Sequence, residues 1–347
     1  MKLNRIQNRI RRLVSSMTGA TYDAARLRNL PRTLEYTGEF GLEILLFLPF
    51  VTWLSQAGLL RGRTIKTYAG MMSFYSGLDY RAFVEKQAPR EFVSPMNRLP
   101  YLPVRSEHDF DGLGRSPFHA YQDFRRKFEA LPLPQDLEAQ IASRPLLIIH
   151  NKHTDEWNSG PVNHISLETL DALFARLGQA FTVVYIRHGI RRTQRGYVGD
   201  DNTMIPFDDE SVLSRYSQIN LFDDLFDRHR TDGGADDVNA FKNALCSRAF
   251  RFITSQGGGA HHLAHFSGSM MAILHRKGKE EQMAYADGYY SFLANPSPIR
   301  LCCRTEAELI DASDLMLQSK VIDGRVLLPP DAAPVVDRLS PWRLRAR

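Results

Sequence analysis

The sequence predicts an α/β fold of about two domains. Its 347 residues are more than one hydrophobic core usually organises. A content of 43% hydrophobic and 24% charged residues is that of an ordinary soluble globular protein. Short apolar runs of strand type alternate with helix-compatible segments, and glycine-rich or polar loops lie between them. This alternation is typical of parallel sheets covered by helices.

The composition gives no sign of a membrane-spanning or secreted protein. The longest apolar run, Ile44–Leu54, contains Pro49 and Thr52 and is well short of the ~20 residues that a spanning helix needs, so we expect a buried helix there. The start of the chain lacks the apolar stretch and cleavage site of a secretory signal. Three cysteines, of which Cys302 and Cys303 are adjacent, do not form a disulfide framework. The cytoplasm is therefore the expected compartment.

The net charge of +5 is concentrated in two segments, one at the start of the chain and one at Arg187–Arg195. In Met1–Gly19, apolar residues recur at helical spacing, and lysine and arginine occupy the other faces. This pattern fits a helix packed on its own domain, and it also fits a basic amphipathic helix lying on an anionic bilayer. The second interpretation would place the protein peripherally at the inner face of the plasma membrane.

A first βα unit is predicted within Pro31–Leu60. Thr33–Tyr36 has the pattern of a strand, a glycine-bracketed turn follows, and a buried helix begins at Leu42. Glu39 lies in the turn and Glu43 in the first turn of the helix. Carboxylates at these places compensate the helix dipole or cap the helix. In a cleft, either one can instead serve as a general base or bind a sugar hydroxyl.

A buried strand ending at His150 runs directly into a polar loop, Asn151–Asn163. In this loop Lys152 is placed to meet a phosphate, and Asp155 or Glu156 to act as a base or to accept a hydroxyl. Trp157 offers a stacking face for a base or a sugar. Many ordinary turns have a similar composition, but a lysine, a glutamate and a tryptophan directly after an apolar strand favour a functional loop.

The next apolar strand, Phe181–Ile186, ends in Arg187 and His188. An arginine at the carboxyl end of a strand can clamp a diphosphate through two hydrogen bonds, and the histidine can donate another. The alternative is a surface salt bridge.

A third strand, Arg251–Ser255, leads into a glycine turn and a helix-compatible segment, Ala260–Phe266. Glycines before a helix let the backbone approach a ligand, and the N–H groups of a first helical turn favour an anion such as a diphosphate. Many βα turns need glycine for geometry alone. The residues of this turn that we assign to ligand binding are Ser255, Gln256, Gly257, Gly258 and Gly259.

Three histidines follow the glycine turn. His261 and His265 have the i, i+4 spacing of a helical zinc pair, but residue 262 is His where the zinc-protease motif has a glutamate base, and no third ligand is apparent. We therefore expect no metal, and we expect His261, at the start of the helix, to hydrogen-bond a phosphate or a sugar.

With these residues in place, the chain resembles bacterial glycosyltransferases of the two-domain GT-B kind. The resemblance is carried by Gly38–Glu43 (GEFGLE), by Asn151–Asn163 together with Tyr185–Gly189 (YIRHG), and by Phe252–Gly278 (FITSQGGGAHHLAHFSG…HRKG). These segments look like a group of proteins from capsule, O-antigen and exopolysaccharide clusters, and more distantly like GT-B fucosyltransferases. The resemblance covers roughly residues 33–317.

The resemblance implies two Rossmann-like domains facing a cleft, an acceptor-side domain at residues 1–143 and a donor-side domain at residues 144–347, with the candidate linker Glu129–Arg144 between them. It implies transfer of a sugar from a nucleotide sugar to a glycan or lipid-linked acceptor in the synthesis of cell-surface polysaccharide. Such enzymes need no metal and no cofactor, because protein cations and backbone N–H groups stabilise the leaving diphosphate.

Two alternatives remain open at this point. One is another transferase on a twin-Rossmann scaffold, such as a polysaccharide pyruvyl transferase, which would also bind an anionic donor. The other is a non-enzymatic protein that uses its basic face to bind a membrane or nucleic acid. We expect no nucleic-acid partner, because the polar residues recur at strand ends rather than along one basic stripe.

Overall fold

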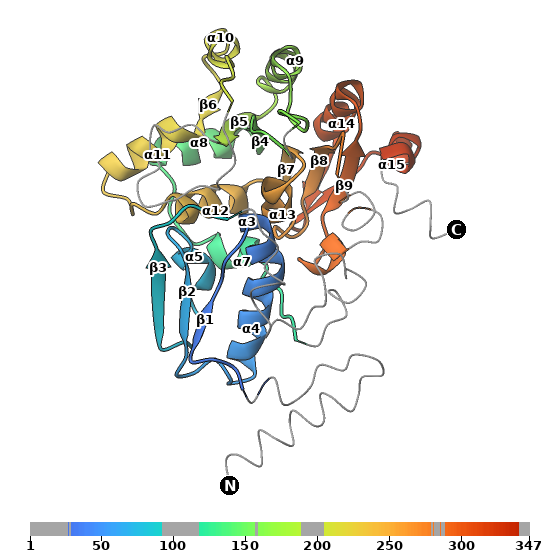
Figure 1. The fold of residues 1–347 in the computed structure, drawn as a ribbon. Helices are drawn as coiled ribbons and strands as arrows, with labels where there is room; N and C mark the ends of the chain where they lie inside the picture. Colours follow the sequence, from blue (N-terminus) through green and yellow to red (C-terminus); the bar gives the residue numbers. More distant parts are fainter. Residues whose placement is uncertain are drawn as a thin grey trace.

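The computed structural model describes residue 27 and residues 29–91, 118–156, 159–188, 205–278, 280, 285 and 289–339. It shows an α/β protein with two parallel sheets that succeed each other along the chain (Figure 1). The predicted α/β fold of two Rossmann-like units is therefore confirmed. The basic segment at residues 1–19 lies outside the described residues.

The first unit (residues 29–91) contains a three-stranded parallel sheet in the order β1-β2-β3. Its strands are β1 (Thr33–Glu35), β2 (Thr64–Tyr68) and β3 (Ala82–Lys86), and its helices are α3 (Phe40–Leu42), the π-helical turn η1 (Glu43–Phe47), α4 (Leu48–Gln56) and α5 (Met72–Tyr75). The α3, η1 and α4 segments follow one another without a break. Every residue of Ile44–Leu54 is buried, as the apolar sequence of that run predicts. Among the described residues, no helix combines the length and the apolar character that crossing a membrane requires.

The second unit is built on a six-stranded parallel sheet in the order β6-β5-β4-β7-β8-β9. Its strands are β4 (Leu146–Lys152), β5 (Thr182–His188), β6 (Asn220–Leu221), β7 (Arg251–Ser255), β8 (Met270–Leu274) and β9 (Ile299–Cys303). The chain moves outward from β4 through β5 and β6, and then returns to the other side of β4 for β7, β8 and β9. The strand order thus reverses between β4 and β7, which is the place where open α/β sheets bind their ligands.

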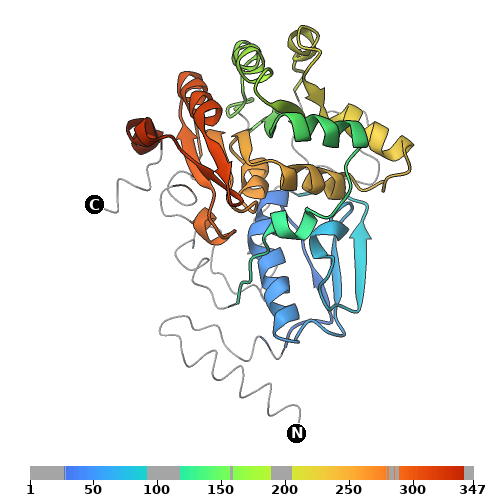
Figure 2. The ribbon, with the colours of Figure 1, turned by 180° about the vertical axis from the view of Figure 1, so that it is seen from behind.

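Helices cover both faces of the large sheet (Figures 1 and 2). On one face, α9 (Leu167–Leu177) and α14 (Glu306–Gln318) share a buried cluster with the sheet. On the other face, α12 (Val238–Arg248) and α13 (Gly258–Leu263) share a cluster with the sheet and with the first unit. The remaining elements are α7 (Phe124–Phe128), α8 (Gln135–Ser143), α10 (Glu210–Leu213), α11 (Phe222–Thr231), η4 (Tyr289–Phe292), β10 (Lys320–Ile322), β11 (Arg325–Leu327), η5 (Pro330–Ala332) and α15 (Ala333–Leu339).

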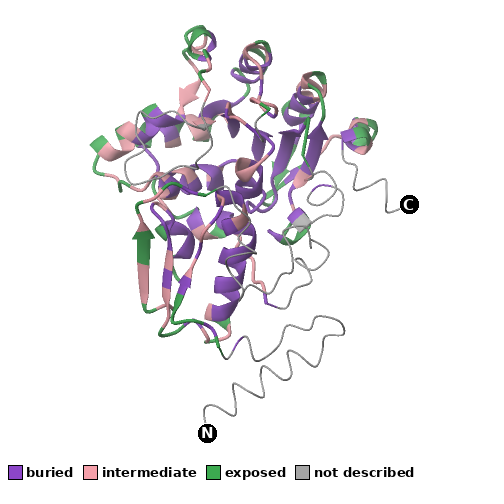
Figure 3. Cartoon of the chain, in the orientation of Figure 1, coloured by how far each residue is buried: buried purple, intermediate pink, exposed green. Residues whose placement is uncertain are grey.

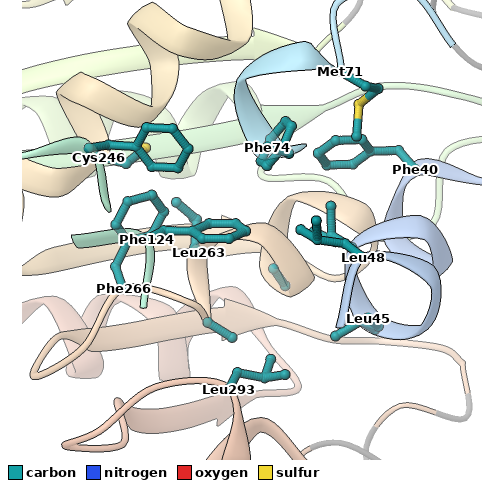
Figure 4. Packing of buried hydrophobic residues seen from close by; sticks show 14 of the residues in the cluster. Phe40, Leu45, Leu48, Met71, Phe74, Phe124, Cys246, Leu263, Phe266 and Leu293 are labelled. Atoms are coloured by element: carbon teal, nitrogen blue, oxygen red, sulfur yellow. The ribbon is translucent and has the colours of Figure 1, made fainter. Parts of the chain in front are cut away.

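One hydrophobic cluster extends through both units (Figure 4). Phe40 and Leu48 of the first unit belong to the same cluster as Phe124 of α7, Leu263 of α13 and Phe266. Buried residues accordingly dominate the region where the two units meet (Figure 3). The face of the large sheet that carries α13 is therefore the face directed at the first unit.

The candidate linker contains α8, and its polar contacts go to the second unit. The hydroxyl of Thr182 donates a hydrogen bond to the carbonyl oxygen of Gln140 (3.0 Å), and Asp136 forms an ion pair with Arg228. The boundary between the two units at residue 143 stays a prediction.

Candidate functional site

Three polar side chains form a row along the carboxyl edge of the large sheet. Lys152 ends β4, and Gln256 and His275 follow β7 and β8 directly. His150 is aligned with Thr254, and Ser255 with Leu274, so Lys152, Gln256 and His275 occupy neighbouring positions on adjacent strands. Side chains alternate between the two faces of a strand. All three therefore lie on the face directed at the first unit, and the pair Lys152 and Gln256 spans the place where the strand order reverses.

The glycine turn after β7 brings backbone against the ammonium group of Lys152. Gly257 has φ 122°, a backbone conformation that residues other than glycine rarely adopt. A Cβ atom at Gly257 would lie 3.0 Å from the Nζ atom of Lys152, and one at Gly259 would overlap the imidazole ring of His150. Gly257 is thus required by its backbone conformation and Gly259 by close packing, and the lysine cation lies directly beside the turn.

The first βα turn of the first unit lies against this glycine turn. A Cβ atom at Gly258 would meet the ring of Phe40 at 3.4 Å and the backbone N of Gly41 at 3.5 Å. A Cβ atom at Gly41 would lie 2.6 Å from the Cδ2 atom of His261. The two turns are therefore in contact, at Gly41 and Gly258. The helix α13 has six residues, so it is shorter than the sequence predicts.

A chain of polar contacts connects the strand ends behind the glycine turn. The Nζ atom of Lys152 lies 3.3 Å from the Oε1 atom of Glu156. The side-chain amide of Asn163 donates to Glu156 (2.9 Å) and to the Oε1 atom of Gln256 (3.0 Å). The amide of Gln256 in turn donates to the carboxylate of Glu280. We call these five residues the polar chain. It positions the cation of Lys152 and the carboxylate of Glu280 on the two sides of Gln256.

The carboxylate of Glu280 ends the polar chain. Its Oε2 atom is buried, has no hydrogen-bond partner among the described residues and lies 3.8 Å from the Nε2 atom of His275. Burial works to raise the pKa of Glu280, but its surroundings, above all the contact with His275, outweigh burial and leave that pKa below its usual value. The carboxylate is therefore ionised at neutral pH.

His261 lies beneath the contact between the two turns. Its Nδ1 atom shares a hydrogen bond with the hydroxyl of Tyr290. Burial lowers the pKa of His261 to about 4, so its ring is neutral at neutral pH. A neutral ring can hydrogen-bond a ligand, but it cannot supply a positive charge to a phosphate.

The other two histidines of α13 and its end are packed in the core. The Nε2 atom of His262 lies 2.6 Å from the Oδ1 atom of Asn243. The ring of His265 stacks on Phe124 with 4.4 Å between the ring centroids, and its Nδ1 atom lies 3.0 Å from the carbonyl oxygen of His261. The described residues contain no group of three or more His, Cys, Asp and Glu side chains that could hold a metal ion.

The four carboxylates expected as candidate bases have different surroundings. Glu43 is fully buried, forms an ion pair with Arg90 (2.7 Å) and accepts a hydrogen bond from Tyr75 (2.7 Å), so it serves the fold of the first unit. Asp155 accepts a hydrogen bond from the backbone N of Gly160 (2.7 Å) and closes a turn. Glu156 belongs to the polar chain. Glu39 precedes α3 in the turn, is half-buried, and its side chain does not cap the helix.

Arg187 and Lys152 do not lie on the same face of the sheet. It is aligned with Asn151, one residue out of phase with Lys152, so the two side chains leave the sheet on opposite faces. Its Nε atom lies 2.7 Å from the Oδ2 atom of Asp209, which also accepts a hydrogen bond from Tyr185 (2.7 Å). Burial raises the pKa of Asp209. The role of Arg187 at a diphosphate stays a prediction.

Three further predicted ligand residues add little to the geometry. Ser255 lies on the same face as Arg187, and its buried hydroxyl has no hydrogen-bond partner among the described residues. Trp157 and the side chain of His188 lie outside the described residues.

Sequence reasoning did not single out four residues that the structure places at or near the polar chain: His150, Asn163, His275 and Glu280. His275 and His150 each end an apolar run, which is the signal that drew attention to Arg187. Asn163 ends the polar loop that the sequence marks, but nothing in the sequence marks Glu280, because its partner Gln256 is distant along the chain.

No family model matches the sequence, and no curated protein sequence matches it. A crystal structure from Listeria monocytogenes, described as a UDP-N-acetylglucosamine 2-epimerase, is similar with a TM-score of 0.44 and 11% sequence identity. The similarity covers 89% of this chain and 95% of that chain. At this level the likeness carries no assignment of activity.

Proposed function

We propose that the protein is a glycosyltransferase that takes a sugar from a nucleotide-sugar donor. The observation that carries the proposal is the position of the Lys152 ammonium beside the Gly257 backbone at the point where the strand order reverses. Lys152 supplies a positive charge, and the glycine turn lets a bulky anion approach the main chain. The donor diphosphate binds there, beside Lys152 and the glycine turn.

The reaction follows from what these groups can stabilise. An acceptor hydroxyl attacks the anomeric carbon of the donor, the bond from that carbon to the diphosphate oxygen breaks, and the electron pair leaves with the diphosphate. Lys152 and the turn stabilise the charge that develops there, because fixed cations and dipoles act strongly in a site that excludes water. The proton of the acceptor hydroxyl passes to a base. We assign this role to Glu39, because it is half-buried in the turn of the first unit that faces the glycine turn.

The acceptor is a glycan or a lipid-linked saccharide of cell-surface polysaccharide synthesis. The resemblance of three sequence segments to proteins from capsule and O-antigen clusters supports this part. The basic segment at residues 1–19 would bring the enzyme to a lipid-linked acceptor at the inner face of the membrane.

A thermal-shift panel with UDP, GDP, CMP and dTDP tests the donor site, because a ligand that binds only the folded state raises its stability. We expect at least one nucleotide to raise the melting temperature. In Lys152→Met this increase should be lost, since a charge-assisted contact to phosphate typically contributes about 1.5–3 kcal/mol.

Lys66→Met is the matched control, because Lys66 also forms an ion pair with a glutamate, Glu35 (3.1 Å), but on β2. It should retain the nucleotide effect. If no nucleotide stabilises the protein, or if both lysine variants respond as the wild type does, the donor site is not at Lys152. Steeply salt-dependent DNA binding would favour a non-enzymatic role instead.

A further inference from the structure

We infer that Glu280 binds a hydroxyl group of the donor sugar. The inference rests on the proposed function, and it adds the subsite for the sugar. The argument uses the position of Glu280, the hydrogen bonds that its carboxylate lacks, and its exposure.

Glu280 lies next to the proposed site of the donor diphosphate. Its carboxylate accepts a hydrogen bond from the side chain of Gln256, the residue directly before Gly257. A Cβ atom at Gly278 would overlap the Oε2 atom of Glu280 and lie 3.3 Å from both Gln256 Nε2 and His275 Nε2. Three side chains from separate segments thus converge at one place beside the turn. Gln256 directly precedes Gly257, whose backbone lies beside Lys152, so a sugar attached to a diphosphate at Lys152 would be next to that place.

Among the described residues, few hydrogen-bond donors reach the carboxylate of Glu280. A carboxylate can accept about four hydrogen bonds, and the amide of Gln256 is the one side-chain donor within hydrogen-bond distance among the described residues. The 3.8 Å between Glu280 Oε2 and His275 Nε2 is too long for a hydrogen bond. An ionised carboxylate with acceptor capacity left over can take hydrogen bonds from the hydroxyl groups of a ligand.

The side chain of Glu280 is partly exposed and therefore within reach of a ligand. The side chain of Glu280 as a whole is 19% exposed, close to the 18% of Lys152, although its Oε2 atom is buried; the side chain of Glu156 is only 7% exposed. Glu280 and Lys152 are therefore the two ends of the polar chain that a ligand can touch. A cation for the diphosphate at one end and an anion for hydroxyl groups at the other match the two parts of a nucleotide sugar.

The experiment separates the two parts of the donor. We would measure by calorimetry the Kd values of UDP and UDP-glucose, of GDP and GDP-mannose, and of dTDP and dTDP-glucose, for the wild type and for Glu280→Gln. For the pair that binds, Glu280→Gln should change the Kd of the nucleoside diphosphate by less than about twofold. It should weaken the nucleotide sugar about 5- to 30-fold, because a neutral amide replaces a charged acceptor.

Two further variants make the result interpretable. Glu306→Gln removes another partly exposed carboxylate of the second unit, which accepts from the backbone N of Ser166 (2.7 Å) and pairs with Arg276 (3.1 Å), and it should leave both Kd values unchanged. Glu280→Asp keeps the charge on a shorter side chain, and it should weaken the nucleotide sugar less than Glu280→Gln does. It replaces Glu280→Gln if that variant does not fold.

The outcomes distinguish the two proposals. If Glu280→Gln leaves the ratio of the two Kd values unchanged, or weakens both ligands equally, the sugar subsite is wrong and the donor site stands. If the wild type binds no nucleoside diphosphate, the proposed function fails, and this inference fails with it.

Discussion

At the scale of single residues, two glutamates four positions apart have opposite surroundings. Glu43 is fully buried with its carboxylate 2.7 Å from the Arg90 guanidinium, which stacks over the ring of Tyr68. Glu39 lies half-buried in the turn that meets the glycine turn of the second unit. The surroundings of Glu43 assign it to stability, whereas Glu39 is the candidate for chemistry.

The same substitution at both positions should separate these roles. Glu43→Gln leaves a buried arginine without its counter-ion, and breaking such a pair typically costs about 3–5 kcal/mol. Urea denaturation would measure this loss. Glu39→Gln should change stability little and, with the donor that the nucleotide panel identifies, lower kcat by roughly 10²–10⁴ while nucleotide affinity is retained.

Glu35→Gln provides a reference for the stability arm, because the ion pairs of Glu35 with Lys66 and Lys86 involve a carboxylate side chain that is 39% exposed. If Glu39→Gln turns over normally and Asp155→Asn or Glu156→Gln is inactive, the base lies in the loop after β4, and our assignment is wrong.

At the scale of elements, strands were easier to predict than the faces on which their side chains lie. The β-branched runs of β4, β5 and β7 are recognisable because parallel strands are buried on both faces. Their polar end residues were also recognisable. Whether Arg187 shares a face with Lys152 depends on how β4 and β5 are aligned. Arg187 is paired with Asn151 rather than with Lys152, and no local sequence pattern encodes this register.

The contact residues of the site were harder to find than its strands. Glycine was predicted after β7 for ligand approach, but Gly257 is required by its φ of 122° and Gly259 by packing against His150. Glu280 joins the site through Gln256, 24 positions away in the chain, so a search for local motifs does not find it.

The contact between the two βα turns depends on a small residue at position 41. Gly41 lies in α3, where alanine is normally favoured over glycine by about 1 kcal/mol. A Cβ atom there would lie 2.6 Å from the buried ring of His261, and overpacking of this kind typically costs about 1–3 kcal/mol. We therefore expect Gly41→Ala to lower the melting temperature and to weaken nucleotide binding.

Gly62→Ala is a useful comparison, because Gly62 has φ 86° with no heavy atom within 4 Å of the added Cβ. It tests backbone strain without a steric overlap, and it should leave nucleotide affinity unchanged. Wild-type affinity in Gly41→Ala would show that the contact between the turns does not shape the donor site.

At the scale of the whole molecule, buried histidines make stability depend on pH. Burial lowers the pKa of His119 to about 3 and the pKa values of His261 and His265 to about 4. An unfolded histidine has a pKa near 6.5, so below that pH the unfolded state binds more protons than the folded state. The stability that these three residues contribute is complete above pH 6.5 and falls as the pH decreases toward 4.

Equilibrium denaturation at a series of pH values checks this expectation. Burial lowers the pKa of His262 as well, and four such histidines give a limiting slope of about 5.5 kcal/mol per pH unit. His265→Gln should reduce the slope by about 1.4 kcal/mol per pH unit, since one proton fewer is taken up on unfolding. A stability that stays constant between pH 6.5 and 4.5 would contradict the burial of these rings as neutral groups.

The hydrophobic cluster that passes from α4 to α13 has a consequence for how the molecule can be divided. Phe40 and Leu48 on one side and Leu263 and Phe266 on the other cover each other, so melting either unit exposes apolar surface on its neighbour to water. The two sheets should consequently lose their structure in a single cooperative step. Either half expressed alone would expose the apolar surface that the other half covers, and it would aggregate rather than fold as an independent domain.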